Sequence, residues 1–102
     1  MTKEVTLLVN DQPVELDYFI QSYIDHTTRG ILAALEGAGQ FDSITDAQVS
    51  VQGKEVAITV SAKTIPANPF VSNLVRSTLV GMVSALKGVA TVDTLTISIE
   101  KV

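Results

Sequence analysis

The sequence predicts an α+β fold, a two-layer sandwich in which one antiparallel sheet carries two helices on one face. Three observations lead to this class. Four segments alternate apolar and polar residues, two longer segments repeat apolar residues at helical spacing, and the two halves of the chain resemble each other. A chain of 102 residues is long enough for one core, so we expect a single domain over 1–102.

The internal resemblance appears when the sequence is shifted by 51 positions. Ten of the 36 residues at positions 2–37 are identical to the residue 51 positions later, with no gap. The matches include Gly30 with Gly81 and Gly37 with Gly88. We therefore predict two repeats, 2–51 and 53–101, related by a pseudo-two-fold axis inside the domain.

Each repeat is expected to form a strand, a helix and a second strand. In the strand segments every second residue is Val, Leu or Ile, as in strands with one buried face. The segments are 4–9, 48–52, 55–60 and 94–100. Gln52-Gly53 is expected to close a tight hairpin between the middle two strands, which would place Val49 opposite Val56.

The two helices are expected between these strands. Asp17 is a candidate N-cap for the first helix, and Asn68 followed by Pro69 marks the start of the second. Gly37 and Gly88 are expected to end them. Apolar residues at helical spacing predict a core-facing stripe on each helix. In the first helix this stripe is Ile20, Tyr23, Ile24, Thr27, Ile31, Ala34 and Leu35, and the second helix repeats it 51 positions later.

The order βαββαβ, internally duplicated, with both helices on one face of the sheet, is the ferredoxin-like pattern. The short segments 12–16 and 63–66 leave an alternative open. If each pairs with the strand before it, the chain forms two duplicated ββαβ units in a six-stranded sheet, and Asn10-Asp11 would close the first added hairpin. Neither topology implies a function, because ferredoxin-like domains serve many.

Composition excludes several classes of function. The chain has no cysteine, which rules out disulfides, thiolate metal sites and a cysteine nucleophile. A net charge of −4 argues against nucleic-acid binding, which requires cations to replace phosphate counterions. The most apolar segment, 69–86, carries Arg76 near its middle, so we expect no membrane span. No signal-like segment is recognised at the start, and we expect the cytoplasm.

Residues able to carry chemistry are few. Asp25, His26 and Arg29 are the weak candidates for an enzyme site. Asp25 and His26 are neighbours on a helix and do not face each other, whereas Asp25 and Arg29 have the spacing of an ordinary surface ion pair. There is one histidine in the chain and no glycine-rich phosphate loop, so we expect no metal and no cofactor.

A surface for self-association is expected on the second helix. On the face opposite the predicted stripe, Leu79, Val80 and Val83 have no evident core to enter, and Leu32 holds the matching place on the first helix. We predict that these four residues form the interface of a homo-oligomer, a dimer in the first instance. The alternative is that the loop 38–46 covers them.

The two halves also differ in charge. Positions 1–51 carry eight acidic and two basic residues, whereas positions 52–102 carry three acidic and five basic residues. An acidic half joined to a basic half suits self-association better than attraction of one charged partner.

The sequence therefore favours a non-enzymatic binding or assembly module without nucleic-acid or membrane partners. One alternative is a regulatory domain that binds a small ligand or cofactor, in a cleft beside the turn 10–13 and the helix starts at Asp17 and Asn68. The other alternative is an enzyme that uses His26, Asp25 and Arg29.

Overall fold

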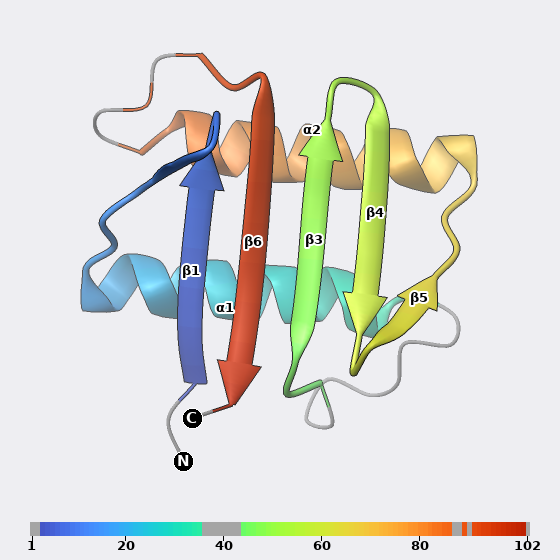
Figure 1. The fold of residues 1–102 in the computed structure, drawn as a ribbon, viewed down its shortest axis with the longest axis horizontal. Helices are drawn as coiled ribbons and strands as arrows, with labels where there is room; N and C mark the ends of the chain where they lie inside the picture. Colours follow the sequence, from blue (N-terminus) through green and yellow to red (C-terminus); the bar gives the residue numbers. More distant parts are fainter. Residues whose placement is uncertain (1–2, 36–43, 87–88, 90, 102) are drawn as a thin grey trace.

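A computed structural model of the chain describes residues 3–35, 44–86, 89 and 91–101. The elements in chain order are β1 (Lys3–Val9), β2 (Gln12–Pro13), α1 (Tyr18–Ala33), β3 (Ala47–Gln52), β4 (Glu55–Val60), β5 (Lys63–Ile65), α2 (Pro69–Ser84) and β6 (Thr94–Lys101). Figure 1 shows one open sheet with both helices on the same face. The predicted α+β class is confirmed, and the molecule is a slab with Cα extents of 35 × 34 × 17 Å.

The strands lie in the order β2-β1-β6-β3-β4-β5, and every neighbouring pair is antiparallel. The two central strands, β3 and β6, each follow a helix, and they pair directly, with Val49 opposite Ile97. Each half of the chain contributes two strands, a helix and a third strand. Six strands are what the alternative with two ββαβ units predicts, and the four-stranded ferredoxin-like topology is not confirmed.

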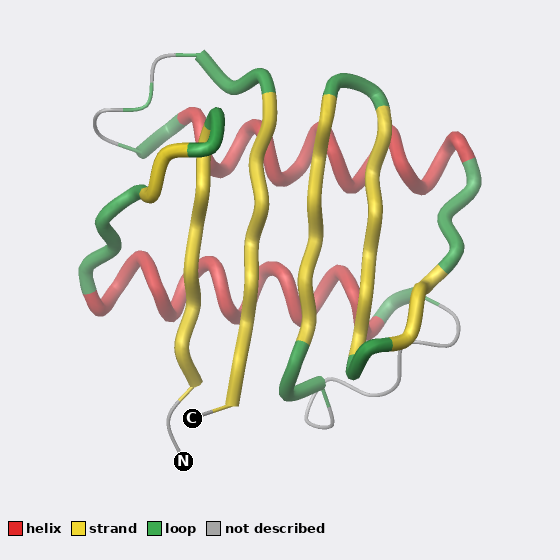
Figure 2. The backbone as a smooth tube through the Cα atoms, in the orientation of Figure 1, coloured by secondary structure: helices red, strands yellow, loops and turns green. Residues whose placement is uncertain are grey.

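The two added strands depend on turns with positive φ angles. Asn10 and Asp11 have φ angles of 53° and 65°, and Ser61 and Ala62, 51 positions later, have φ angles of 51° and 66°. Two consecutive residues with φ above zero match the right-handed twist of a tight hairpin. The chain therefore turns back after β1 and after β4, and β2 and β5 pair beside them (Figure 2).

Replacing Ala62 with Gly is expected to raise the free energy of unfolding by about 0.5–1 kcal/mol, because a Cβ at positive φ is strained and glycine is not. Urea unfolding of the variant against the unchanged chain measures this. The matched control is Ala57→Gly in β4, where the glycine loses only entropy and should lower stability by about as much. An Ala62→Gly variant that is less stable than the unchanged chain would contradict the account.

The two-residue loop between β3 and β4 lies one residue later in the chain than predicted. Gln52 pairs with Glu55, so the two-residue loop is Gly53-Lys54, and Val49 lies opposite Ile58 instead of Val56. Gly53 has a φ of 60°, the value that a II′ turn requires at its first central residue. Either pairing keeps the apolar residues on one face, so the alternation could not decide between them.

The core lies between the sheet and the helices. Ten of the eleven sheet residues predicted to face the helices are buried, and Val56 is half-buried. The buried ones are Val5, Leu7, Val9, Val49, Val51, Ile58, Val60, Leu95, Ile97 and Ile99. The helices bury Ile24 and Leu32 from α1 and Val75, Leu79 and Val83 from α2. This core is aliphatic throughout its described part.

The predicted interface of Leu32, Leu79, Val80 and Val83 is therefore wrong. Leu32, Leu79 and Val83 are 0% exposed inside the chain, and Val80 packs partly buried against the same core. Both helices are rotated by roughly one residue, about 100°, from the predicted orientation. The reason is that α2 is apolar nearly all round, so helical spacing alone permitted more than one inward face.

The helices end at Ala33 and Ser84, where the backbones of Ala34 and Ala85 cap them. Gly37 and Gly88, which were expected to end them, lie outside the described residues. Across the described part of the chain, neither helix is long and apolar enough to cross a membrane.

Candidate interaction surface on the helix layer

Two side-chain caps fix where the helices begin. The Asp17 carboxylate accepts a hydrogen bond of 2.8 Å from the backbone N–H of Ile20, and the Asn68 side chain accepts one of 2.8 Å from that of Val71. Both predicted caps are confirmed, with Pro69 as the first residue of α2. These equivalent starts place equivalent residues of the two helices on the same sides.

The outer helix face is defined here as the exposed residues of α1 and α2. They are Tyr18, Phe19, Tyr23, His26 and Gly30 in α1, and Pro69, Phe70, Asn73, Leu74, Ser77, Thr78, Gly81 and Ser84 in α2. None of these is Lys, Arg, Asp or Glu. The charged residues of the two helices are Asp25 and Arg29, which are buried, and Arg76, which is half-buried. An exposed helix surface without charge is unusual for a surface that contacts only water.

The aromatic residues are concentrated on this face. Four of the five in the chain lie there, with exposed fractions of 89% for Tyr18, 69% for Phe19, 50% for Tyr23 and 72% for Phe70. The fifth, Phe41, lies outside the described residues. Aromatic side chains contribute most when buried, because each removes a large area from water. These four rings therefore leave a large apolar area exposed outside the aliphatic core.

Two of these rings form a rigid projection near the start of α1. The rings of Phe19 and Tyr23 stack with centroids 6.2 Å apart and an interplanar angle of 23°. In α2, Phe70 and Leu74 occupy the equivalent positions and are 72% and 54% exposed. The N-terminal half of each helix therefore carries the bulky apolar residues of the outer helix face.

A groove of about 600 Å³ runs between the two helices. Phe19, Ile20, Tyr23 and Thr27 of α1 line one side, and Thr78, Gly81, Met82, Ala85 and Leu86 line the other. The helices run in opposite directions (Figure 1), so the bulky half of α1 lies beside the small residues at the end of α2. The antiparallel arrangement likewise sets Phe70 toward the end of α1 that carries Gly30.

Among the described residues, nothing near Gly30 or Gly81 requires glycine. A Cβ built on either residue meets nothing within 4 Å, so no other backbone approaches the helix closely there. A glycine inside a helix costs about 1 kcal/mol relative to alanine. Two at equivalent, exposed positions are explained if something outside the described chain approaches the helix backbone there.

The three enzyme candidates do not form a catalytic unit. Both oxygens of Asp25 accept hydrogen bonds of 2.8 Å from Arg29, and this pair is buried instead of exposed as predicted. The ring of His26 is 64% exposed, its Nδ1 lies 2.8 Å from the Ser22 carbonyl oxygen, and the nearest Asp25 oxygen is 4.0 Å away. At 4.0 Å the Asp25 carboxylate is beyond hydrogen-bond distance of the ring, so it does not hold the imidazole in the orientation of a general base in this structure.

Thr28 of α1 is 1% exposed, and its Oγ1 has no hydrogen-bond partner among the described residues. We expect Thr28→Val to raise the free energy of unfolding by about 1 kcal/mol, because it removes an unpaired buried hydroxyl and keeps the shape. The control is Thr78→Val, which removes a hydroxyl that donates to the Leu74 carbonyl at 2.9 Å. Chemical denaturation of both variants measures the difference, and a destabilised Thr28→Val would contradict the assignment.

The main polar side chain of the cleft beside the turn 10–13 stabilises the fold through hydrogen bonds within the chain. The cleft measures about 440 Å³, but the Asn10 side chain that faces it is already bonded. Its Nδ2 donates to the Thr91 carbonyl at 2.8 Å, and its Oδ1 accepts from the N–H groups of Asp93 at 2.8 Å and Thr94 at 3.0 Å. Asn10 therefore ties the first turn to the segment that leads into β6.

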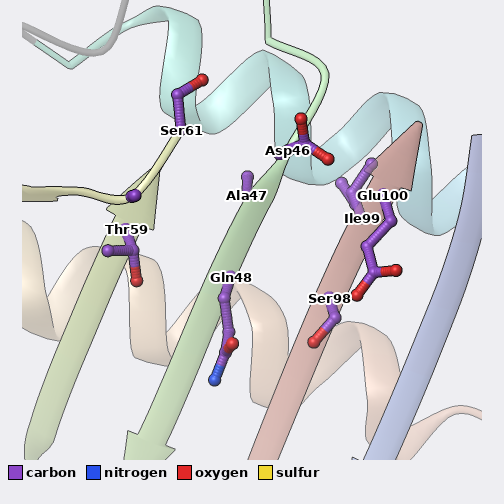
Figure 3. A pocket seen from close by; sticks show the side chains of 9 residues that line it. Asp46, Ala47, Gln48, Thr59, Ser61, Ser98, Ile99 and Glu100 are labelled. Atoms are coloured by element: carbon purple, nitrogen blue, oxygen red, sulfur yellow. The ribbon is translucent and has the colours of Figure 1, made fainter.

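A second hollow, of about 310 Å³, lies at one end of β3, β4 and β6, with Asp46 and Glu100 at its rim (Figure 3). Gln48 stands at its centre, opposite Thr59 on one side and Ser98 on the other. These polar side chains are exposed or half-exposed, and none is held buried and directed into the hollow. Among the described residues, no three His, Asp or Glu side chains gather in the manner of a metal site.

Comparison of the chain with known proteins finds no match to a family model, to a curated protein or to a solved structure. The outer helix face is thus assigned from its own chemistry. The surplus of apolar residues that the sequence predicts for an outer surface lies on the buried side of the helices. The signal in the sequence for the exposed face is the pairing of Phe19 with Phe70 and of Gly30 with Gly81 at equivalent positions.

Proposed function

We propose that the protein is a non-enzymatic assembly module, homo-oligomeric, whose contact surface is the outer helix face. The single observation that carries this proposal is the placement of four of the five aromatic residues on an exposed helix surface without charge. Exposed aromatic side chains on a surface without Lys, Arg, Asp or Glu are typical of an interaction site. It replaces the interface predicted from the sequence and retains the function predicted there.

The equal order of elements in the two halves supports the proposal. A duplication of one ββαβ unit accounts for the turns, caps and glycines at equivalent positions, and it places a bulky apolar projection at the start of each helix. Selection that keeps the exposed projections in both copies is expected if both are covered in the assembly. The duplication and the cytoplasmic location stay predictions from the sequence.

Sedimentation velocity of the full chain over a range of concentrations tests the proposal. We expect the mass of an oligomer at micromolar concentration, and the mass of a monomer for Phe70→Glu, because a carboxylate buried in an apolar contact has no partner there. Phe70 is 72% exposed in the single chain, so its replacement leaves the monomer folded. The matched control, Ala57→Glu, adds the same charge at an exposed strand position and should leave the mass unchanged.

If the unchanged protein sediments as a monomer up to about 100 μM, the proposal is overturned, because a specific contact of ordinary size has a dissociation constant below about 100 μM. Circular dichroism of each variant, compared with that of the unchanged chain, separates lost association from lost folding.

A further inference from the structure

We infer that the second copy in this assembly docks so that the bulky start of each helix lies on the end of a helix in the other copy that carries Gly30 or Gly81. This inference rests on the proposed function and adds the geometry of the contact. It places a two-fold axis in the plane of the helix layer.

The exposed side chains of the outer helix face differ in size along each helix. Bulky residues stand at the start of each helix, as Phe19 with Tyr23 and Phe70 with Leu74. Toward the end of each helix, Gly30 and Gly81 leave open space above the backbone, and His26 stands one turn before Gly30. The two helices start at opposite ends of the layer (Figure 1), so the two bulky starts lie toward one diagonal of the layer and the two glycines lie toward the other.

This arrangement of bulky and open regions is compatible with two-fold symmetry. Turning such a layer over about an axis that lies in its own plane, either along the helices or across them, brings each bulky start onto a helix end that carries Gly30 or Gly81. The surface is therefore complementary to itself, which is the requirement of a two-fold, isologous interface. This docking explains why glycine stands at the exposed helix positions, because an aromatic ring from the other copy would lie against the backbone at Gly81.

The charge and the area of the outer helix face also favour a second copy of the chain. The face carries no Lys, Arg, Asp or Glu, so it offers nothing to a partner that is selected by complementary charges. An anionic lipid surface is recognised by Lys and Arg beside the apolar residues, which the exposed helix positions lack. A slab face with Cα extents of 35 × 34 Å provides the roughly 800 Å² per partner that a stable interface buries.

The docking geometry is tested by filling the open space at Gly81 with a bulky side chain. Gly81→Phe fills this space, and we expect it to raise the dissociation constant of the dimer about 100-fold or more, because the overpacked contact occurs twice in a two-fold dimer. The monomer tolerates this change, since nothing lies within 4 Å of the new Cβ and phenylalanine suits a helix better than glycine. The matched control is Ala57→Phe on the sheet, which should leave the dissociation constant unchanged.

Removing a projection from the same chain should then restore the dimer. Combined with Gly81→Phe, Phe70→Ala restores it if α2 lies on α2. Phe19→Ala restores it if α1 lies on α2 of the other copy; because Phe19 and Gly81 also line one groove within a chain, this case is tested by mixing Gly81→Phe chains with Phe19→Ala chains, which should then form the dimer. Restoration by either one supports the inference. If Gly81→Phe leaves the dissociation constant unchanged, or if neither second change restores the dimer, the inference is overturned while the proposed assembly stands. A monomeric unchanged chain would remove both.

Discussion

Replacing Arg29 with Met is expected to lower the free energy of unfolding by about 3–5 kcal/mol, because it leaves the Asp25 carboxylate buried without the guanidinium that pairs with it. The pair is bidentate, with both bonds at 2.8 Å, and the Arg29 and Asp25 side chains are only 6% and 12% exposed. For a domain of this size such a loss is a large share of the total stability. Urea unfolding followed by circular dichroism measures it.

The control removes the charge of both partners. In α2 the positions equivalent to Asp25 and Arg29 are Arg76 and Val80, so the fold does not require an ion pair at this place on a helix. We expect Asp25→Leu combined with Arg29→Met to recover most of the loss, because two apolar side chains can replace a buried pair at little cost. A single Arg29→Met variant as stable as the unchanged chain would show that the carboxylate is open to water.

Replacing Leu79 with Ala is expected to cost about 2–5 kcal/mol of folding stability, as for a leucine truncated inside a packed core. Leu79 is 0% exposed between α2 and the sheet. The prediction depends directly on how α2 is rotated, since the sequence had placed Leu79 on the outside. Thermal and urea unfolding at concentrations where the chain is monomeric measure the cost.

Leu74, on the opposite side of the same helix, is the matched control. It is 54% exposed, so Leu74→Ala should change the stability of the monomer by less than about 1 kcal/mol. The same variant should weaken the oligomer, because Leu74 belongs to the outer helix face. If the costs of the two variants were reversed, the inward and outward faces of α2 would have to be exchanged.

Much of the fold could be predicted because its signals are local. Alternation located the four long strands, and the side chains of Asp17 and Asn68 located both helix starts. The short strands β2 and β5 were foreseen only as an alternative, because two or three residues carry too little pattern to identify a strand. The turn residues Asn10 and Asp11 were the better signal, since they tolerate positive φ.

The candidate site could not be predicted because it depends on helix rotation. Tyr23 and Leu74 extend the apolar stripe in one direction round the helices, and Leu32 and Val83 extend it in the other. Spacing alone does not choose between them. What decides is the fit to an aliphatic sheet, which admits Leu32, Leu79 and Val83 and leaves the aromatic rings outside. Likewise, the spacing of Asp25 and Arg29 predicts a pair but not its burial.

The most direct test of the central claim, that the outer helix face is covered by a second copy, is the alkylation rate of a single cysteine on that face. Because the chain has no cysteine of its own, Ser77→Cys and Ala57→Cys each introduce one reporter, on the helix layer and on the sheet. The account predicts that the rate at position 77 falls as the protein concentration rises, while the rate at position 57 stays constant. Equal rates at position 77 from nanomolar to 100 μM protein would contradict it.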